Sequence, residues 1–421
     1  MATSVTSTQQ PARPAPDEPP EQWPVRRSLE IGLWLAAALA AFVVLREYWP
    51  LNPAPRQVDL QVYVGAVRWV WEGGALYDFE VTETGLPFTY PPFGLIAFAP
   101  TLWIPMSVMK TLSLLWAGAS VLTLAYLTAH RSSVFRTGLL RRVPPRLAVP
   151  VLCILLGLSN LVLVGTRLGQ ISLLLVAVVA VDVLVVAERW PKLGGILTGV
   201  AAAIKLTPLA VLPMLWLAGR RRAAYTGAAT FGVLTAGAAA VFPGATADYV
   251  LHKAGDLQRF GNPASVLNQS VNALLLRMGL PEGGVQKALF LIAALAILAI
   301  AWWRAAVLYR DGDEYGALVV TGAAMVAASP ISWNHHLVWL WLAAFLTVAR
   351  RWWWQLAWMG ALALITEFGV RSHLTSGVVP PADWLSANLR AIAAVVVAVL
   401  VPVVTLRAWQ LRSAWTSGAQ R

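Results

Sequence analysis

Apolar residues in this chain come in blocks of about 20, the length that an α-helix needs to cross the roughly 30 Å hydrocarbon core of a bilayer. Of its 421 residues, 58% are hydrophobic and only 12% are charged, whereas soluble domains average about 25% charged residues. Trp residues cluster at block ends, as Trp352-Trp353-Trp354 does, where indole rings suit the headgroup region. The sequence therefore predicts an all-α polytopic membrane protein.

The blocks predict about twelve transmembrane helices within one domain, residues 28–410. The first block follows Arg26-Arg27 with no small-residue cleavage site after it, so we expect a retained span instead of a signal peptide. Residues 1–27 and 411–421 are expected to be cytoplasmic tails, the first of them disordered because of its composition. The expected spans are residues 29–46, 107–129, 147–165, 170–187, 193–204, 208–218, 223–242, 286–308, 314–331, 335–349, 353–369 and 385–408, of which 193–204 with 208–218 is either a re-entrant pair or two short spans.

The positions of Lys and Arg predict that both termini are cytoplasmic. In that orientation the inner segments hold 20 of the 32 Lys and Arg residues, five of them between 131 and 146, as the positive-inside rule requires. The same rule explains most of the net charge of +12, so we expect no nucleic-acid partner. We expect a multi-pass protein of the plasma membrane, in contact with its lipids, whose long segments 47–106 and 243–285 lie outside.

The first outer segment has structure signals of its own. Apolar residues recur at helical spacing from Leu60 to Trp71, with polar residues between them, which predicts an amphipathic helix at the outer membrane surface. Gly73-Gly74 ends this helix. The apolar stretch 93–103 is too short to span, so we expect it to dip into the outer leaflet.

Two charged residues stand in apolar surroundings. Asp59 begins the amphipathic helix, where it is either the helix N-cap or a catalytic carboxylate held at the membrane surface. Lys205 follows a run of uncharged residues. Its ammonium either snorkels to the outer headgroups or meets an anion, and a lipid phosphate is the anion available at that depth.

The other polar candidates are histidines, amides and tyrosines. His335-His336 lies in an outer turn and is either an interface cap or a pair of phosphate donors or proton carriers. Amides pair well with sugar hydroxyls, although each also suits an ordinary loop. The candidates for substrate binding are Tyr63, Tyr90, Gln170, Asn268 and Gln269.

The charge rule places all of these polar candidates, which come from separate segments, on the outer face. A carboxylate, basic groups and amides that converge at one membrane face suit a site for an anionic lipid and a polyhydroxyl acceptor. Neighbouring histidines on a helix point about 100° apart and are poor joint metal ligands, and the single Cys153 excludes a cysteine cluster. We therefore expect neither a metal nor a cofactor.

Six short motifs occur in an order that resembles a known family. They are Val58-Asp59-Leu60-Gln61-Val62-Tyr63, Phe88-Thr89-Tyr90-Pro91-Pro92-Phe93, Gly169-Gln170-Ile171, Lys205-Leu206-Thr207-Pro208, Asn268-Gln269-Ser270 and Ser329-Pro330-Ile331-Ser332-Trp333-Asn334-His335-His336. In this order they resemble the actinobacterial polyprenyl-phosphate-mannose-dependent α-1,2-mannosyltransferases, glycosyltransferase family 87, which have the membrane GT-C fold.

The resemblance implies a reaction and roles for its residues. Polyprenyl phosphate mannose would be the donor, and a mannosylated glycolipid, either a phosphatidylinositol mannoside or a lipoglycan mannan, the acceptor. Asp59 would be the general base of a single inverting displacement. Lys205, His335 and His336 would bind the donor phosphate. We expect the protein to act as a monomer.

There are two alternative functions, one from another class and one within enzymes. A lipid-linked glycan transporter or flippase would show paired repeats and a midplane site, but the 193–218 pair has no counterpart in the other half of the chain. An enzyme that transfers another polyprenyl-phosphate sugar, such as arabinose or glucose, would need the same residue types. Only the resemblance favours mannose.

Overall fold

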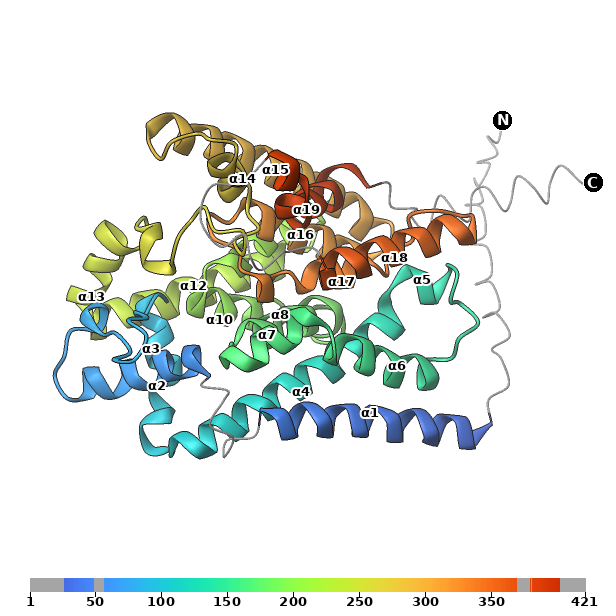
Figure 1. Ribbon diagram of the computed structural model, residues 1–421, viewed down its shortest axis with the longest axis horizontal. Coiled ribbons are helices and arrows are strands. Elements are labelled where there is room, and N and C mark those ends of the chain that lie inside the picture. Colours follow the sequence, from blue (N-terminus) through green and yellow to red (C-terminus); the bar gives the residue numbers. More distant parts are fainter. Residues whose placement is uncertain (1–25, 49–56, 369–378, 380, 402–421) are drawn as a thin grey trace, which may run out of the picture.

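The computed structural model describes residues 26–48, 57–368, 379 and 381–401, and within these ranges the chain is helical (Figure 1). The predicted tails lie outside the described residues, except that Arg27 begins the first helix. The helices are α1 (Arg27–Glu47), α2 (Val58–Trp71), α3 (Pro92–Phe98), α4 (Met106–Arg131), α5 (Ser133–Arg136), α6 (Pro145–Gly157), α7 (Asn160–Leu168), α8 (Ser172–Val181), α9 (Ala187–Arg189), α10 (Ile196–Ile204), α11 (Val211–Leu217), α12 (Arg221–Val241), α13 (Pro243–Asp248), α14 (Val271–Arg277), α15 (Gly284–Arg310), α16 (Glu314–Ala328), α17 (Val338–Ala343), α18 (Trp352–Phe368) and α19 (Trp384–Val395). The all-α prediction is confirmed for this part of the chain.

Four helices in the described ranges, α1, α4, α12 and α15, are long and apolar enough to cross a membrane. They have 21 to 27 residues, which corresponds to roughly 30–40 Å at 1.5 Å per residue. The pair α6 and α7 passes the same test but is bent by 61°. Shorter apolar helices cover several of the other expected spans, so the count of twelve stays a prediction.

Helix α1 runs along the edge of the bundle beside α4 and α6 (Figure 1). Its side chains are mostly exposed, among them Leu35, Leu39 and Phe42. A surface of exposed large apolar side chains is what lipid contact requires. The apolar character of this helix is therefore explained by a membrane and not by packing within the chain.

The prediction for residues 335–349 matched the structure least well, because the helix there is α17, Val338–Ala343, of only 6 residues. Beyond it the N–H groups of residues 344–346 bond to carbonyls three residues back, and the next two bond to side chains. Thr347 N–H donates to Ser133 Oγ at 3.1 Å, and Val348 N–H donates to Gln355 Oε1 at 3.0 Å. Side chains from neighbouring elements thus replace the helical bonds that hydrophobicity alone predicts.

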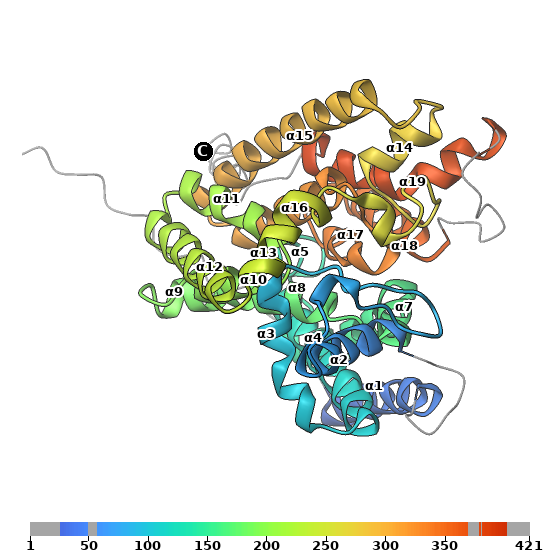
Figure 2. The same ribbon diagram turned by 90° about the vertical axis from the view of Figure 1, so that its left-hand side faces the viewer.

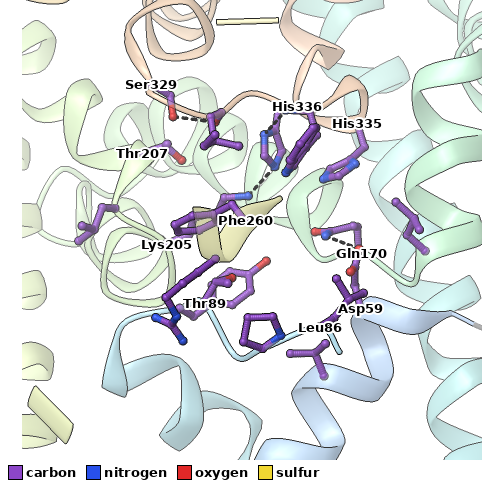
Figure 3. A pocket seen from close by; sticks show the side chains of 18 of the residues that line it. Asp59, Leu86, Thr89, Gln170, Lys205, Thr207, Phe260, Ser329, His335 and His336 are labelled. Carbon is purple, nitrogen blue, oxygen red and sulfur yellow. Dashed lines mark hydrogen bonds between the residues drawn. The ribbon is translucent and has the colours of Figure 1, made fainter. Parts of the chain in front are cut away.

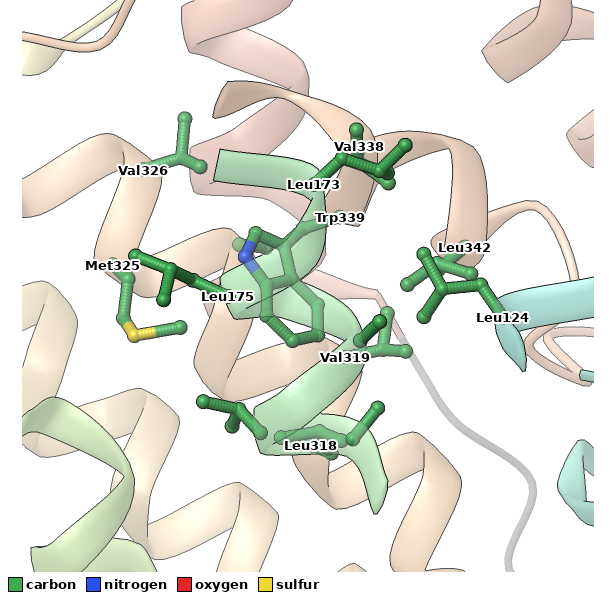
Figure 4. Close-up of a cluster of buried hydrophobic side chains, with 14 of the residues drawn as sticks. Leu124, Leu173, Leu175, Leu318, Val319, Met325, Val326, Val338, Trp339 and Leu342 are labelled. Atoms are coloured by element: carbon green, nitrogen blue, oxygen red, sulfur yellow. The ribbon is translucent and has the colours of Figure 1, made fainter. Parts of the chain in front are cut away.

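A packed apolar core joins α4, α8, α16 and α17 (Figure 4). Its largest member is Trp339, whose ring lies against α16. A Cβ at Gly322 would come within 2.1 Å of the Trp339 ring, so only glycine admits the indole at this depth. This contact fixes α17 on α16, and with it the turn 329–336 that precedes α17.

The first long loop forms the two short helices that its sequence predicts. Helix α2 buries Leu60, Val64 and Val67 on one side, and Gly73 follows its end with φ 94°, a conformation that favours glycine. Helix α3 begins at Pro92, a residue suited to a first helical turn. Helices α2, α3 and α13 lie at one end of the bundle (Figure 1), which faces the viewer in Figure 2, and α7 contacts α2. That end holds the candidate site.

Candidate active site

A cavity of about 440 Å³ opens at this end of the bundle (Figure 3). Its walls come mainly from six separate segments: α2, the loop 86–91, the end of α7 with Gln170, the turn 205–207, and the two loops 249–260 and 329–336. The predicted residues Asp59, Tyr63, Tyr90, Gln170, Lys205, His335 and His336 all line it. The structure therefore brings seven of the nine predicted site residues to one cavity.

Asp59 is not the N-cap of α2. That position is taken by Gln57, whose backbone is left-handed with φ 44° and whose side chain makes no capping bond. Asp59 stands in the first turn, and its Oδ2 accepts a hydrogen bond of 2.5 Å from Gln170 Nε2. The capping interpretation is therefore wrong, and the carboxylate is held by a cavity residue.

Gly169 explains how Gln170 reaches Asp59. It caps the end of α7 in a left-handed conformation with φ 71°. A Cβ at this position would lie 2.7 Å from the Leu60 Cβ, closer than carbon atoms pack. The glycine thus lets α7 approach α2 and presents the next side chain to the carboxylate.

Gln170 also joins the carboxylate to two buried tyrosines. Its Oε1 accepts from Tyr63 Oη at 3.1 Å and from Ser172 Oγ at 3.1 Å. The hydroxyl of Tyr63 lies 3.0 Å from that of Tyr90. Both amide ends of Gln170 are therefore occupied, which fixes the orientation of the Asp59 carboxylate.

Burial raises the pKa of Asp59 to about 6, while the hydrogen bond from Gln170 and the charge of Lys205 lower it. A carboxyl group with this pKa is mostly ionised near neutral pH. It is also a stronger base than an ordinary Asp, whose pKa is about 3.9. The carboxylate is thus suited to remove a proton from a hydroxyl group.

Lys205 stands across the cavity from Asp59. Its Nζ donates to Ser172 Oγ at 3.2 Å, lies 2.8 Å from His336 Nε2 and sits 5.8 Å from the centre of the Tyr90 ring. A chain of hydrogen bonds thus joins Asp59 to Lys205 through Gln170 and Ser172. A reacting group has room between the carboxylate and the amine.

The two histidines differ in their surroundings. His336 Nδ1 accepts from the backbone N–H of Trp333 at 3.1 Å, which an imidazolium ring cannot do, so His336 is neutral. Its Nε2 lies 2.8 Å from Lys205 Nζ, so the imidazole and the amine face the same point of the cavity. His335 Nε2 is buried without a hydrogen-bond partner among the described residues. This nitrogen, on a residue that lines the cavity, is available to a ligand.

Asn268 and Gln269 do not line the cavity. Asn268 donates to the carbonyls of Pro263 and Pro330 and accepts from Ser332 N–H. Gln269 donates to the carbonyls of Val266 and Ala387 and accepts from Ala391 N–H. Both are fully buried and satisfied by backbone. The prediction that they contact substrate is corrected: they hold the loop 329–332 and α19 in place.

Sequence reasoning missed three polar residues at or behind the cavity. Ser172 links Gln170 to Lys205, and Arg259 lines the cavity from the second long loop. Arg390, fully buried in α19, donates to Asn334 Oδ1 at 2.9 Å and so supports the turn that carries the histidines. An Arg inside an apolar block was the available signal for this last residue.

The residues present give no sign of a metal site. No group of three His, Cys, Asp or Glu side chains in the described ranges is placed to hold an ion. Cys153 is a free thiol at an intermediate depth. The expectation that the protein uses no metal stays a prediction.

The sequence profile of glycosyltransferase family 87 matches residues 88–330, which is more than half of the chain. The chain belongs to glycosyltransferase family 87. This confirms the resemblance drawn from the six motifs. Together with the apolar helices, membership of family 87 makes the protein a multi-pass membrane glycosyltransferase. Asp59, His335 and His336 lie outside the matched residues.

The names of similar proteins agree with membership of family 87. A polyprenol-phosphate-mannose-dependent alpha-(1-2)-phosphatidylinositol mannoside mannosyltransferase of Mycobacterium tuberculosis is 30% identical over 347 residues, covering 78% of each chain. A pentamannoside mannosyltransferase of Mycolicibacterium smegmatis with the same donor is 34% identical over 290 residues, covering 67% of each. One from M. tuberculosis is 35% identical over 309 residues, covering 67% of this chain and 64% of the relative.

Proposed function

We propose that this protein transfers mannose from polyprenyl phosphate mannose to a phosphatidylinositol mannoside and forms an α-1,2 linkage with inversion. One observation carries the mechanism: the Asp59 carboxylate, fixed by Gln170, faces the same cavity as Lys205. The names of the relatives support the donor, the acceptor and the linkage. A lipoglycan mannan with a terminal mannose remains an alternative acceptor of the same chemistry.

The mechanism is a single displacement with Asp59 as general base. Asp59 takes the proton of an acceptor hydroxyl as that oxygen attacks the anomeric carbon of mannose. Among the described residues that line the cavity, Asp59 carries the only carboxyl group. A double displacement would need a second carboxylate about 5 Å away as nucleophile, so the residue set favours inversion.

The leaving group is polyprenyl phosphate, for which we propose Lys205 and the two histidines as ligands. The ammonium of Lys205 would form a charge-assisted contact with the phosphate. His335 Nε2 and His336 Nε2 supply further polar contacts. Charge and hydrogen bonds of this kind stabilise the oxygen that develops negative charge.

Replacement of Lys205 by Met is expected to weaken donor use more than acceptor use. Loss of a charge-assisted contact lowers kcat/KM for the donor by about ten- to a hundred-fold, whereas the acceptor KM stays near the wild-type value. Steady-state kinetics with each substrate varied in turn measures both. Lys253→Met is the control, because Lys253 pairs with Asp248 at 3.7 Å outside the cavity lining. Equal activity of the two variants would leave Lys205 as an anchor to headgroups.

We further propose that the cavity faces the outside of the plasma membrane and that the termini are cytoplasmic. The distribution of Lys and Arg supports this orientation. In a background with Cys153 replaced by Ala, an impermeant thiol reagent is expected to label Thr84→Cys but not Arg142→Cys in intact cells, and both after permeabilisation. Both positions are exposed. The reverse pattern would place the site in the cytoplasm.

The decisive test uses the purified protein in lipid vesicles with labelled polyprenyl phosphate mannose and a phosphatidylinositol mannoside. The expected product has one more mannose, with an α-1,2 linkage that NMR identifies. We propose that the monomer is the active form. Movement of the intact donor across the vesicle without transfer would support the transporter instead, and transfer from polyprenyl phosphate arabinose alone would correct the sugar.

A further inference from the structure

Arg259 is a second cationic side chain of the cavity, and neither the motifs nor the names of relatives give it a role. It comes from the loop 249–260, far in sequence from Lys205. Its guanidinium lies 5.2 Å from the centre of the Tyr77 ring, and its Nη2 donates to the Phe88 carbonyl at 3.0 Å. The ring and the carbonyl hold the group rigidly, which is how a charge is prepared for a ligand.

Arg259 has no carboxylate partner in the described part of the chain. The nearby Asp248 is paired instead, at 3.7 Å to Lys253 and 3.9 Å to His252. The half-buried guanidinium donates one N–H to a carbonyl, so its other N–H groups can still donate to an anion. This leaves an unneutralised positive charge at the wall of the cavity.

Arg259 and Lys205 approach the same short piece of chain. Arg259 bonds to the carbonyl of Phe88, Lys205 lies over the ring of Tyr90, and Thr89 between them lines the cavity. The two cations therefore flank residues 88–90. Both side chains line the cavity beside this segment.

We propose that Arg259 binds the donor phosphate together with Lys205 and carries the second negative charge that the phosphate gains in the reaction. This rests on the proposed function. Arg259 is a permanent cation whose planar group can offer parallel N–H donors to a phosphate, whereas Lys205 acts as a point charge. The ligand class is a lipid phosphate, as a monoanionic diester before transfer and a dianionic monoester after it.

The charges of the cavity balance at both ends of this reaction. With the donor bound, Arg259 and Lys205 carry two positive charges, against the Asp59 carboxylate and the single charge of the phosphodiester. The bond from the anomeric carbon to the phosphate oxygen breaks, its electron pair stays on that oxygen, and the acceptor oxygen forms the new bond. Its proton moves to Asp59. Two cations then face one dianion, so no net charge is left buried at either stage.

The test compares affinities for two lipid phosphates, polyprenyl phosphate and its monoanionic methyl ester, as inhibitors of the vesicle-bound enzyme. The wild type is expected to prefer the dianion, and Arg259→Gln to lose about ten- to a hundred-fold of that affinity while the ester is affected less. Its kcat falls by a similar factor. The acceptor KM stays unchanged. If Arg259 only supported the fold, its replacement would be expected to change the acceptor KM as well.

Arg259→Lys keeps the charge and is expected to keep the preference for the dianion, so it carries the test if Arg259→Gln does not fold. Lys253→Gln, which removes a charge from the same outer segment without touching the cavity, is the matched control. Loss of preference in the control, or an unchanged preference in Arg259→Gln, would overturn the assignment. If the wild type transfers a sugar other than mannose, only the proposed identity of the donor sugar is refuted. The assignment of Arg259 would stand, because the leaving group is still polyprenyl phosphate.

Discussion

Asp59→Asn is expected to abolish mannose transfer while the protein stays folded and inserted. The amide can still accept from Gln170 Nε2 through its oxygen, and the substitution is nearly isosteric. It cannot take a proton from the acceptor hydroxyl. General-base catalysis contributes about a hundred- to ten-thousand-fold, so the initial rate with saturating donor and acceptor should fall by at least about a hundred-fold.

Two further measurements make the Asp59 result specific. The Asp59→Asn protein should still bind the donor, because the residues proposed to bind the phosphate lie across the cavity. Competition of polyprenyl phosphate with labelled donor measures this binding. Asp78→Asn is the matched control, a carboxyl in the same long loop that does not line the cavity. Normal turnover by a well-expressed Asp59→Asn protein would rule out Asp59 as the general base.

The helices were predictable from the sequence because membrane spans leave a long, uniform signal. Blocks 29–46, 107–129, 223–242 and 286–308 correspond to α1, α4, α12 and α15 within a few residues. The interruptions within other blocks were not predictable. The bend between α6 and α7 and the early end of α17 depend on which side chains bond to backbone groups from neighbouring elements.

The site was predictable where a polar residue lacked a local role. Lys205 and the His335-His336 pair stand in apolar surroundings, and the structure brings them to one cavity. Asn268 and Gln269 have the same chemistry as Gln170, because an amide bonds equally well to a backbone carbonyl or to a sugar hydroxyl. Only the packing of the loop 263–270 against α19 decides between these roles. Arg259 is one of the basic residues of the long segment 243–285, and nothing in its local sequence distinguishes it from the others.

The acid limb of the pH–rate profile is expected near pH 6, not near pH 4. Asp59 must be ionised to act as a base, and burial raises its pKa to about 6. Below that pH the ionised fraction falls tenfold per unit, so kcat/KM at pH 4 should be about a hundredth of its plateau value. The donor phosphodiester stays anionic over this range, so binding of the donor should change little.

Gln170→Leu identifies the group that titrates. The hydrogen bond from Gln170 lowers the pKa of Asp59, so its removal raises that pKa and shifts the acid limb to higher pH. His336→Ala serves as the comparison, because Gln170 bonds to Asp59 and not to either histidine. A limb that moves in His336→Ala but stays in place in Gln170→Leu would assign the titration to the histidine pair. A limb that moves upward in Gln170→Leu alone ties the active form of the enzyme to one ionised carboxylate.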